Sequence, residues 1–217
     1  TSDNTGAILL AVSIGFGAGA ASVLFRRLIQ FCQYLLQGEL GGLLSIGMGK
    51  AWPVVIIALG GLLVGLIAKY FAPETKGHGV PEVMLAVARH GGRIRFRTTI
   101  FKVISAAICI GSGGSAGREG PIVQIGAGIG SVIGQFFKLP ERRTILTVAC
   151  GAAAGVAATF NAPMAGVIFA LEVILNRFTA MSFGLLVMSS ATATATARWL
   201  SVEGDSPAFK VITTYHM

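Results

Sequence analysis

Long apolar stretches dominate the chain, and polar or glycine-rich breaks divide them into helix-sized pieces. A hydrocarbon core about 30 Å thick requires roughly 20 apolar residues per spanning helix, and several stretches are shorter than that. The pattern predicts eight helical pieces, at residues 5–37, 52–71, 80–90, 98–110, 121–137, 141–158, 163–176 and 180–200. The expected fold class is therefore all-α, that of a polytopic membrane protein with short and broken helices.

The segment 191–198 is the one place where the pattern is ambiguous, because alanine and threonine alternate strictly there. Such alternation is typical of a strand. An isolated strand in lipid would leave its backbone groups unpaired, so we predict a helix whose threonine hydroxyls bond back to the preceding turn.

Composition supports a membrane protein: 53% of the 217 residues are hydrophobic, and only 12% are charged. Soluble domains carry about 25% charged residues, which argues against that class. The net charge of +8 comes largely from basic clusters at 89–102 and 138–143. We interpret both clusters as cytoplasmic by the positive-inside rule, and predict a multi-pass protein of the cell membrane. Lys102 is expected to face inward, whereas Arg26 and Arg27 do not fit this orientation simply.

Three widely spaced cysteines, Cys32, Cys109 and Cys150, lie in or beside apolar runs and are interpreted as buried thiols. Their spacing fits neither a disulfide framework nor a metal site, and no metal or cofactor is predicted. The basic clusters lack interleaved aromatic residues, so nucleic acid is not an expected partner. The chain starts at Thr1 without a recognisable signal peptide, and we expect it to begin inside a longer protein.

Three segments share one construction, in which a flexible stretch is followed by a proline and then by a helical pattern: 77–81, 117–121 and 160–163. Proline suits the first helical turn, where free amides and the positive end of the helix dipole point outward. At bilayer depth this arrangement indicates an anion site. A phosphate-binding enzyme is disfavoured, because the glycine-rich segment 111–117 lacks the Gly-Lys-Ser/Thr ending and follows no strand. We therefore expect no enzyme.

Glu119 is the most informative single residue, because it precedes an apolar helix that a carboxylate enters only at a cost. Two roles are open from spacing alone. In the first, Glu119 has only a structural role, and the helix N-terminus stabilises its carboxylate. In the second, the carboxylate occupies the anion site itself and leaves it when protonated.

The three motifs together resemble the CLC family of chloride channels and chloride/proton exchangers. They read Gly-His-Gly-Val-Pro at 77–81, Gly-Arg-Glu-Gly-Pro at 117–121 and Phe-Asn-Ala-Pro-Met-Ala-Gly at 160–166. The resemblance extends from about Gly6 to Phe209. It implies two inverted-topology halves per subunit, a homodimer with one pore per subunit, and anions held at helix N-termini. Residues 1–217 then correspond to the N-terminal half of the membrane domain, with short, broken and tilted helices.

The resemblance also implies roles for individual residues. Glu119 matches the gating glutamate of the family. The residues expected to bind a chloride ion are His78, Gly79, Val80, Pro81, Arg118, Gly120, Pro121, Ile122 and Val123. Many chloride-selective members have serine where this chain has His78. The imidazole either donates to the anion, or it turns aside while the Gly79 and Val80 amides bind.

A further motif concerns proton coupling. Exchangers of the family have two adjacent acids where this chain has Glu172 and Val173. Glu172 either matches the first acid of a proton pathway or is a polar residue at a helix end. Valine cannot carry a proton, so the resemblance favours channel-like passage of chloride, gated by Glu119. A proton-coupled antiporter and a non-conducting structural half stay open as alternatives.

The remaining anion-contacting parts of the family, a Gly-x-Phe-x-Pro loop and a tyrosine, belong to the second half and are not found in this sequence. The chain is then a fragment, a first half given alone, or a half-size protein that pairs with itself or with another chain. The expected partners are a small anion, the lipid bilayer, a second copy and the missing half.

Overall fold

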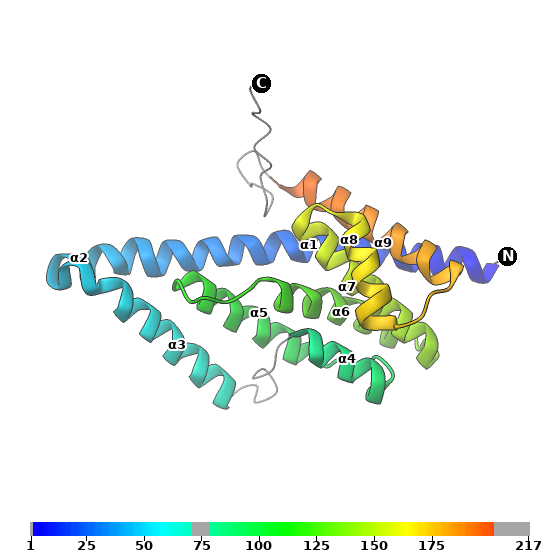
Figure 1. Ribbon diagram of the computed structural model, residues 1–217, viewed down its shortest axis with the longest axis horizontal. Coiled ribbons are helices and arrows are strands. Elements are labelled where there is room, and N and C mark those ends of the chain that lie inside the picture. Colours follow the sequence, from blue (N-terminus) through cyan, green and yellow to red (C-terminus); the bar gives the residue numbers. More distant parts are fainter. Residues whose placement is uncertain (1, 71–78, 202–217) are drawn as a thin grey trace, which may run out of the picture.

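A computed structural model describes residues 2–70 and 79–201, and the regular elements of this part of the chain are all helices (Figure 1). Three short irregular helices, labelled η, interrupt the regular ones. The elements in chain order are α1 (Ser2–Gln33), η1 (Tyr34–Leu40), α2 (Gly41–Met48), η2 (Gly49–Ala51), α3 (Trp52–Tyr70), α4 (Gly79–His90), α5 (Phe96–Gly111), α6 (Glu119–Phe136), α7 (Glu141–Phe160), α8 (Pro163–Phe169), η4 (Ala170–Leu175) and α9 (Ala180–Leu200).

The predicted helical pieces all occur, with most boundaries shifted by one to three residues. The predicted end of the first piece, at residue 37, is wrong. Helical structure continues from α1 through η1, a π-helix, into α2. Gln33 and Gly41, at the two junctions, keep right-handed helical dihedral angles, so glycine at position 41 does not end the helix. The predicted bounds 180–200 match α9. Its threonines bond back as expected, since Thr194 Oγ1 donates to the Ser190 carbonyl at 2.9 Å and Thr196 Oγ1 to the Thr192 carbonyl at 2.8 Å.

Within residues 2–70 and 79–201, four helical segments are long and apolar enough to cross a membrane: residues 5–47, α3, α7 and α9. Helices α1 and α9 run side by side in the same direction (Figure 1). Glycines of α1 lie at the contact. A Cβ atom added to Gly19 would lie 2.6 Å from the Ala193 carbonyl oxygen, so only glycine permits this approach. At the far end of the contact, Arg27 Nη2 donates to the Leu200 carbonyl at 3.2 Å. Arg27 thus donates a hydrogen bond to a carbonyl at the C-terminal end of α9, where positive charge is also favourable. This contact explains the position of Arg27, which the positive-inside rule did not.

Helices α6 and α7 are antiparallel and pack backbone against backbone. A side chain at Gly126 would collide with the Gly151 carbonyl, and one at Gly130 with the Thr147 carbonyl. The glycine spacing along α6 therefore brings bare backbone against a neighbouring helix, as the sequence predicts. Because most of α7 from Thr144 onward is buried, this contact holds α6 against the core of the molecule.

Four residues of the first basic cluster lie beside the segment that carries the second. Arg89, His90, Arg93 and Arg95 line a cavity of about 470 Å³ together with Glu141 at the start of α7. The clusters therefore share one side, which is what a common cytoplasmic orientation requires.

Candidate functional site

The N-termini of α4 and α6 meet at two glycines, one from each proline-containing motif. A side chain at Gly79 would collide with the Gly120 carbonyl, so the glycines let the two backbones touch. Gly79 is buried and Gly120 is half-buried. The structure thus brings together two of the three segments in which the sequence predicts an anion site.

Glu119 is the first residue of α6, and its side chain is exposed. A side chain at Gly117 would collide with the Glu119 carboxylate, so the carboxylate folds back over the loop that precedes the helix. Arg118, also exposed, is the N-cap residue and has no side-chain capping bond. The acidic group therefore lies at the positive end of the helix dipole, where negative charge is stabilised.

The backbone amides of this turn are only partly committed to the helix. The Ile122 amide donates to the Arg118 carbonyl at 3.1 Å, so it already has an acceptor. Pro121 has no N–H, and the first amides of a helix lack intrahelical acceptors. The amides of Glu119 and Gly120 are then the ones most available to an anion. The side chains of Ile122 and Val123 are buried in the core, and their anion-binding role stays a prediction.

The predicted site residues of α4 lie partly outside the described residues. This applies to His78, whose two alternative roles stay open. Val80 is half-buried and Pro81 is exposed at the start of α4.

The third proline-containing motif serves a helix contact instead. Asn161 ends α7 in the left-handed conformation, at φ 55°, and its Oδ1 accepts a hydrogen bond from Arg198 Nε of α9 at 2.7 Å. Pro163 then starts α8, which packs on α7 and α9. A side chain at Gly166 would collide with the Ala153 carbonyl. The motif therefore holds α8 tightly in the bundle.

Glu172 and Val173 lie in η4, the wide-turned helix that continues α8. The Glu172 side chain is exposed, whereas Val173 packs against the main hydrophobic core. Val173 thus takes part in packing at the position that the resemblance links with proton transfer.

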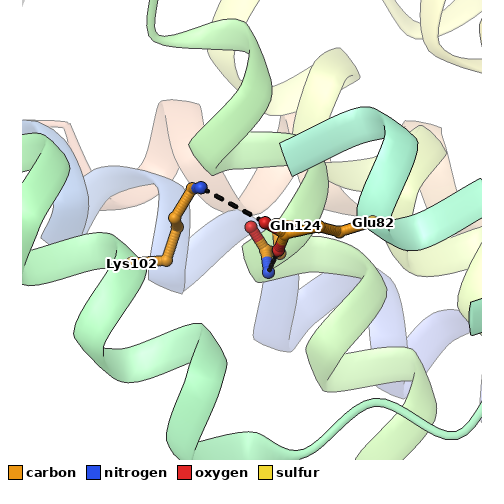
Figure 2. A network of polar contacts seen from close by, with 3 residues as sticks. All are labelled: Glu82, Lys102 and Gln124. Atoms are coloured by element: carbon orange, nitrogen blue, oxygen red, sulfur yellow. Dashed lines mark hydrogen bonds and ion pairs between the residues drawn. The ribbon is translucent and has the colours of Figure 1, made fainter. Parts of the chain in front are cut away.

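Sequence reasoning missed a polar cluster beside the paired N-termini. Lys102 of α5 points toward Glu82 of α4 and Gln124 of α6 (Figure 2). Lys102 is buried, which confirms the expectation that it faces inward. Gln124, a polar residue within the apolar pattern of a membrane helix, was the available signal. Within the described residues, no group of three or more His, Cys, Asp or Glu side chains is placed to hold a metal ion.

Comparison with known proteins decides the family. Residues 60–217 match the family model described as "Voltage gated chloride channel". The chain belongs to the CLC family. A putative chloride channel protein ClcB-like of Ralstonia nicotianae is 32% identical over 192 residues, which are 86% of this chain and 45% of that protein. The H(+)/Cl(-) exchange transporter ClcA of Klebsiella pneumoniae is 33% identical over 79% of this chain and 37% of its own length.

Solved CLC structures share the fold. A slow cyanobacterial Cl⁻/H⁺ antiporter matches with a TM-score of 0.75 and 28% identity, over 89% of this chain and 46% of that one. A CLC-type fluoride/proton antiporter matches with a TM-score of 0.72 and 27% identity, over 91% and 47%. The chain thus spans less than half the length of these relatives. The all-helical CLC-type fold, the multi-pass membrane localisation and the expectation of no enzyme are confirmed.

Proposed function

We propose that residues 1–217 form the N-terminal half of a CLC membrane domain that passes chloride, or a similar small monovalent anion, across the membrane. In this proposal the anion binds at the paired N-termini of α4 and α6, and Glu119 gates access to it. A second, inverted half completes the path, and the complete subunits form a homodimer.

The observation that carries the proposal is the contact between Gly79 and Gly120. It places two helix N-termini, and thus two sets of outward-pointing amides and two positive dipole ends, at one point. Glu119 lies at the same turn, so its carboxylate is a natural competitor for those amides. Protonation would remove its charge and open the site to an anion.

Channel-like passage is favoured over proton exchange by one residue. Val173 is apolar and packed against the core, so it cannot relay protons. The alternative is a proton-coupled antiporter, which is supported by the named activity of the Klebsiella relative. In that case protons would reach Glu119 through water or through another acid.

The test is anion flux through the complete protein in liposomes. Glu119→Gln is expected to keep chloride flux but to remove its dependence on pH, because the amide cannot titrate. The matched control is Glu141→Gln, an exposed acid at the start of α7, which should leave both properties unchanged. Chloride flux that Glu119→Gln abolishes, or that keeps its pH dependence, would contradict the gating role.

Proton movement separates the two modes of transport. We expect the complete protein to carry chloride down its gradient without a fixed number of protons moving in the opposite direction. Steady proton uptake against a chloride gradient at constant stoichiometry would establish the antiporter. Absence of flux with both halves present would establish a non-conducting structural half. The isolated residues 1–217 are expected not to conduct, because they supply only part of the path.

A further inference from the structure

The polar cluster at the α4–α5–α6 contact holds two opposite charges in a largely buried place. The Lys102 Nζ atom lies 3.5 Å from Glu82 Oε1, and the side chains are only 11% and 24% exposed. Glu82 Oε2 accepts a hydrogen bond of 2.6 Å from Gln124 Nε2. Figure 2 shows the lysine approaching from α5 while the carboxylate and the amide lie together on the other side. Three helices thus converge on a single carboxylate.

The contact with Lys102 is an electrostatic pairing rather than a short hydrogen bond. Among the described residues, Glu82 Oε1 has no hydrogen-bond partner and faces the ammonium group at ion-pair distance. The carboxylate is therefore held in place by Gln124, while its charge is directed at Lys102. A buried charge is tolerated only when an opposite charge compensates it, so each of these two groups makes the other acceptable there.

The cluster lies about one helical turn from the paired N-termini. Glu82 follows Gly79 by three residues in α4, and Gln124 follows Gly120 by four residues in α6. The Gln124 Oε1 atom lies 3.2 Å from the point where a Cβ of Gly79 would be, so this amide touches the beginning of α4. One turn corresponds to about 5.4 Å along a helix. An anion at the N-termini would therefore be close enough to respond to a change in the charge of the cluster.

We propose that the negative charge of Glu82 reduces the positive electrostatic potential that Lys102 produces at the paired N-termini. The ion pair thereby sets the affinity of the site for an anion. The inference rests on the proposed function. Gln124 is the positioning residue that keeps the carboxylate beside the lysine. The charge of Lys102 alone would strengthen anion binding and slow anion release. When Glu82 is paired with it, the anion is attracted mainly by the backbone amides and the helix dipoles.

The pair predicts effects of opposite sign for its two members. Glu82→Gln removes one negative charge beside Lys102, so the cluster becomes more positive and chloride should bind more tightly. Lys102→Met leaves the carboxylate charge uncompensated, so chloride should bind more weakly. At an effective dielectric constant of about 20, a unit charge roughly 5 to 10 Å from an anion changes the dissociation constant roughly 10- to 200-fold. The double variant should return to within about threefold of the unaltered protein, because it is again neutral at this place.

The experiment is isothermal titration of sodium chloride into the complete purified protein and the three variants. Glu141→Gln and Arg142→Gln are the matched controls, because they remove one exposed charge of each sign at the start of α7. Their dissociation constants should change by less than about twofold, as solvent and salt screen exposed charges. Glu82→Gln preserves the shape of the side chain and still offers Gln124 an acceptor, so it tests the sign even if Lys102→Met does not fold.

The outcomes separate the inference from the function on which it rests. Opposite shifts that cancel in the double variant support the electrostatic role of the pair. Weakening by both single variants, or no change by Glu82→Gln, shows a structural contact only and overturns the inference, while the proposed anion site stands. If the unaltered protein does not bind chloride, the proposed function fails, and the inference fails with it.

Discussion

Replacement of Gly126 by alanine tests whether the contact between α6 and α7 depends on bare backbone. The added Cβ would collide with the Gly151 carbonyl oxygen on the facing helix. Neither atom belongs to a flexible side chain, so the helices themselves must move apart. Because α7 is buried along most of its length, it cannot shift freely. The displacement would therefore fall mainly on α6, the helix that begins with Glu119.

The expected magnitude follows from two opposing effects. Overpacking a close contact destabilises a protein by about 1–3 kcal/mol. Alanine has a helix propensity about 1 kcal/mol better than glycine, which offsets part of this. The net loss should be about 0–2 kcal/mol, and for a chain of this size that corresponds to a fall in Tm of up to about 8 °C.

The assay is thermal unfolding of the detergent-purified protein, with Gly184→Ala as the matched control. Gly184 is an exposed glycine inside α9, and an added Cβ would meet no atom within 4 Å. This variant should keep or slightly raise the Tm, since only the propensity effect applies. Equal Tm values for Gly126→Ala and Gly184→Ala would refute the reasoning, because the collision would then have no consequence.

Three further predictions concern other contacts. Ser22→Ala removes the 2.8 Å hydroxyl pair with Thr159 and should destabilise the protein by about 1 kcal/mol; a double-mutant cycle with Thr159→Val would give no coupling if the pair were irrelevant. Asn161→Gly should be tolerated better than Asn161→Ala, because glycine adopts the left-handed conformation without strain; equal Tm values would contradict this. Cys150, which is 2% exposed, should react with N-ethylmaleimide only after denaturation, as mass spectrometry of the labelled peptide can show.

The sequence predicts helix positions well because hydrophobic length and proline placement are local signals. Proline at 53, 121 and 163 stands within the first three residues of α3, α6 and α8, where its missing N–H does no harm. The end of the first helix was predicted wrongly for a related reason. A glycine inside a helix costs only about 1 kcal/mol relative to alanine, and Gly41, which lies against the Trp52 ring, stays helical.

Only part of the candidate site could be predicted from the sequence. The motifs identified Glu119 and both glycines, since each motif is contiguous in the chain. The pairing of Glu82 with Lys102 and Gln124 was not predicted, because it depends on how α4, α5 and α6 cross in space. The crossing is set by small residues, and several arrangements of the same helices satisfy one hydrophobic pattern.

Helix α6 shows why packing and chemistry cannot be separated in this chain. Gly126 and Gly130 let it pack closely on α7, and Gly120 touches Gly79 of α4. A Cβ added to Gly128 would lie 2.7 Å from Thr99 Oγ1, so α5 also approaches closely. Three neighbours therefore fix the position of its N-terminus, and the same close approaches bring Gln124 within reach of Glu82. A larger residue at any of these glycines would move the amides of the first turn and weaken the polar cluster at once. Substitutions distant from Glu119 should for that reason alter anion binding as well as stability, whereas substitutions on the exposed face of α9 should not.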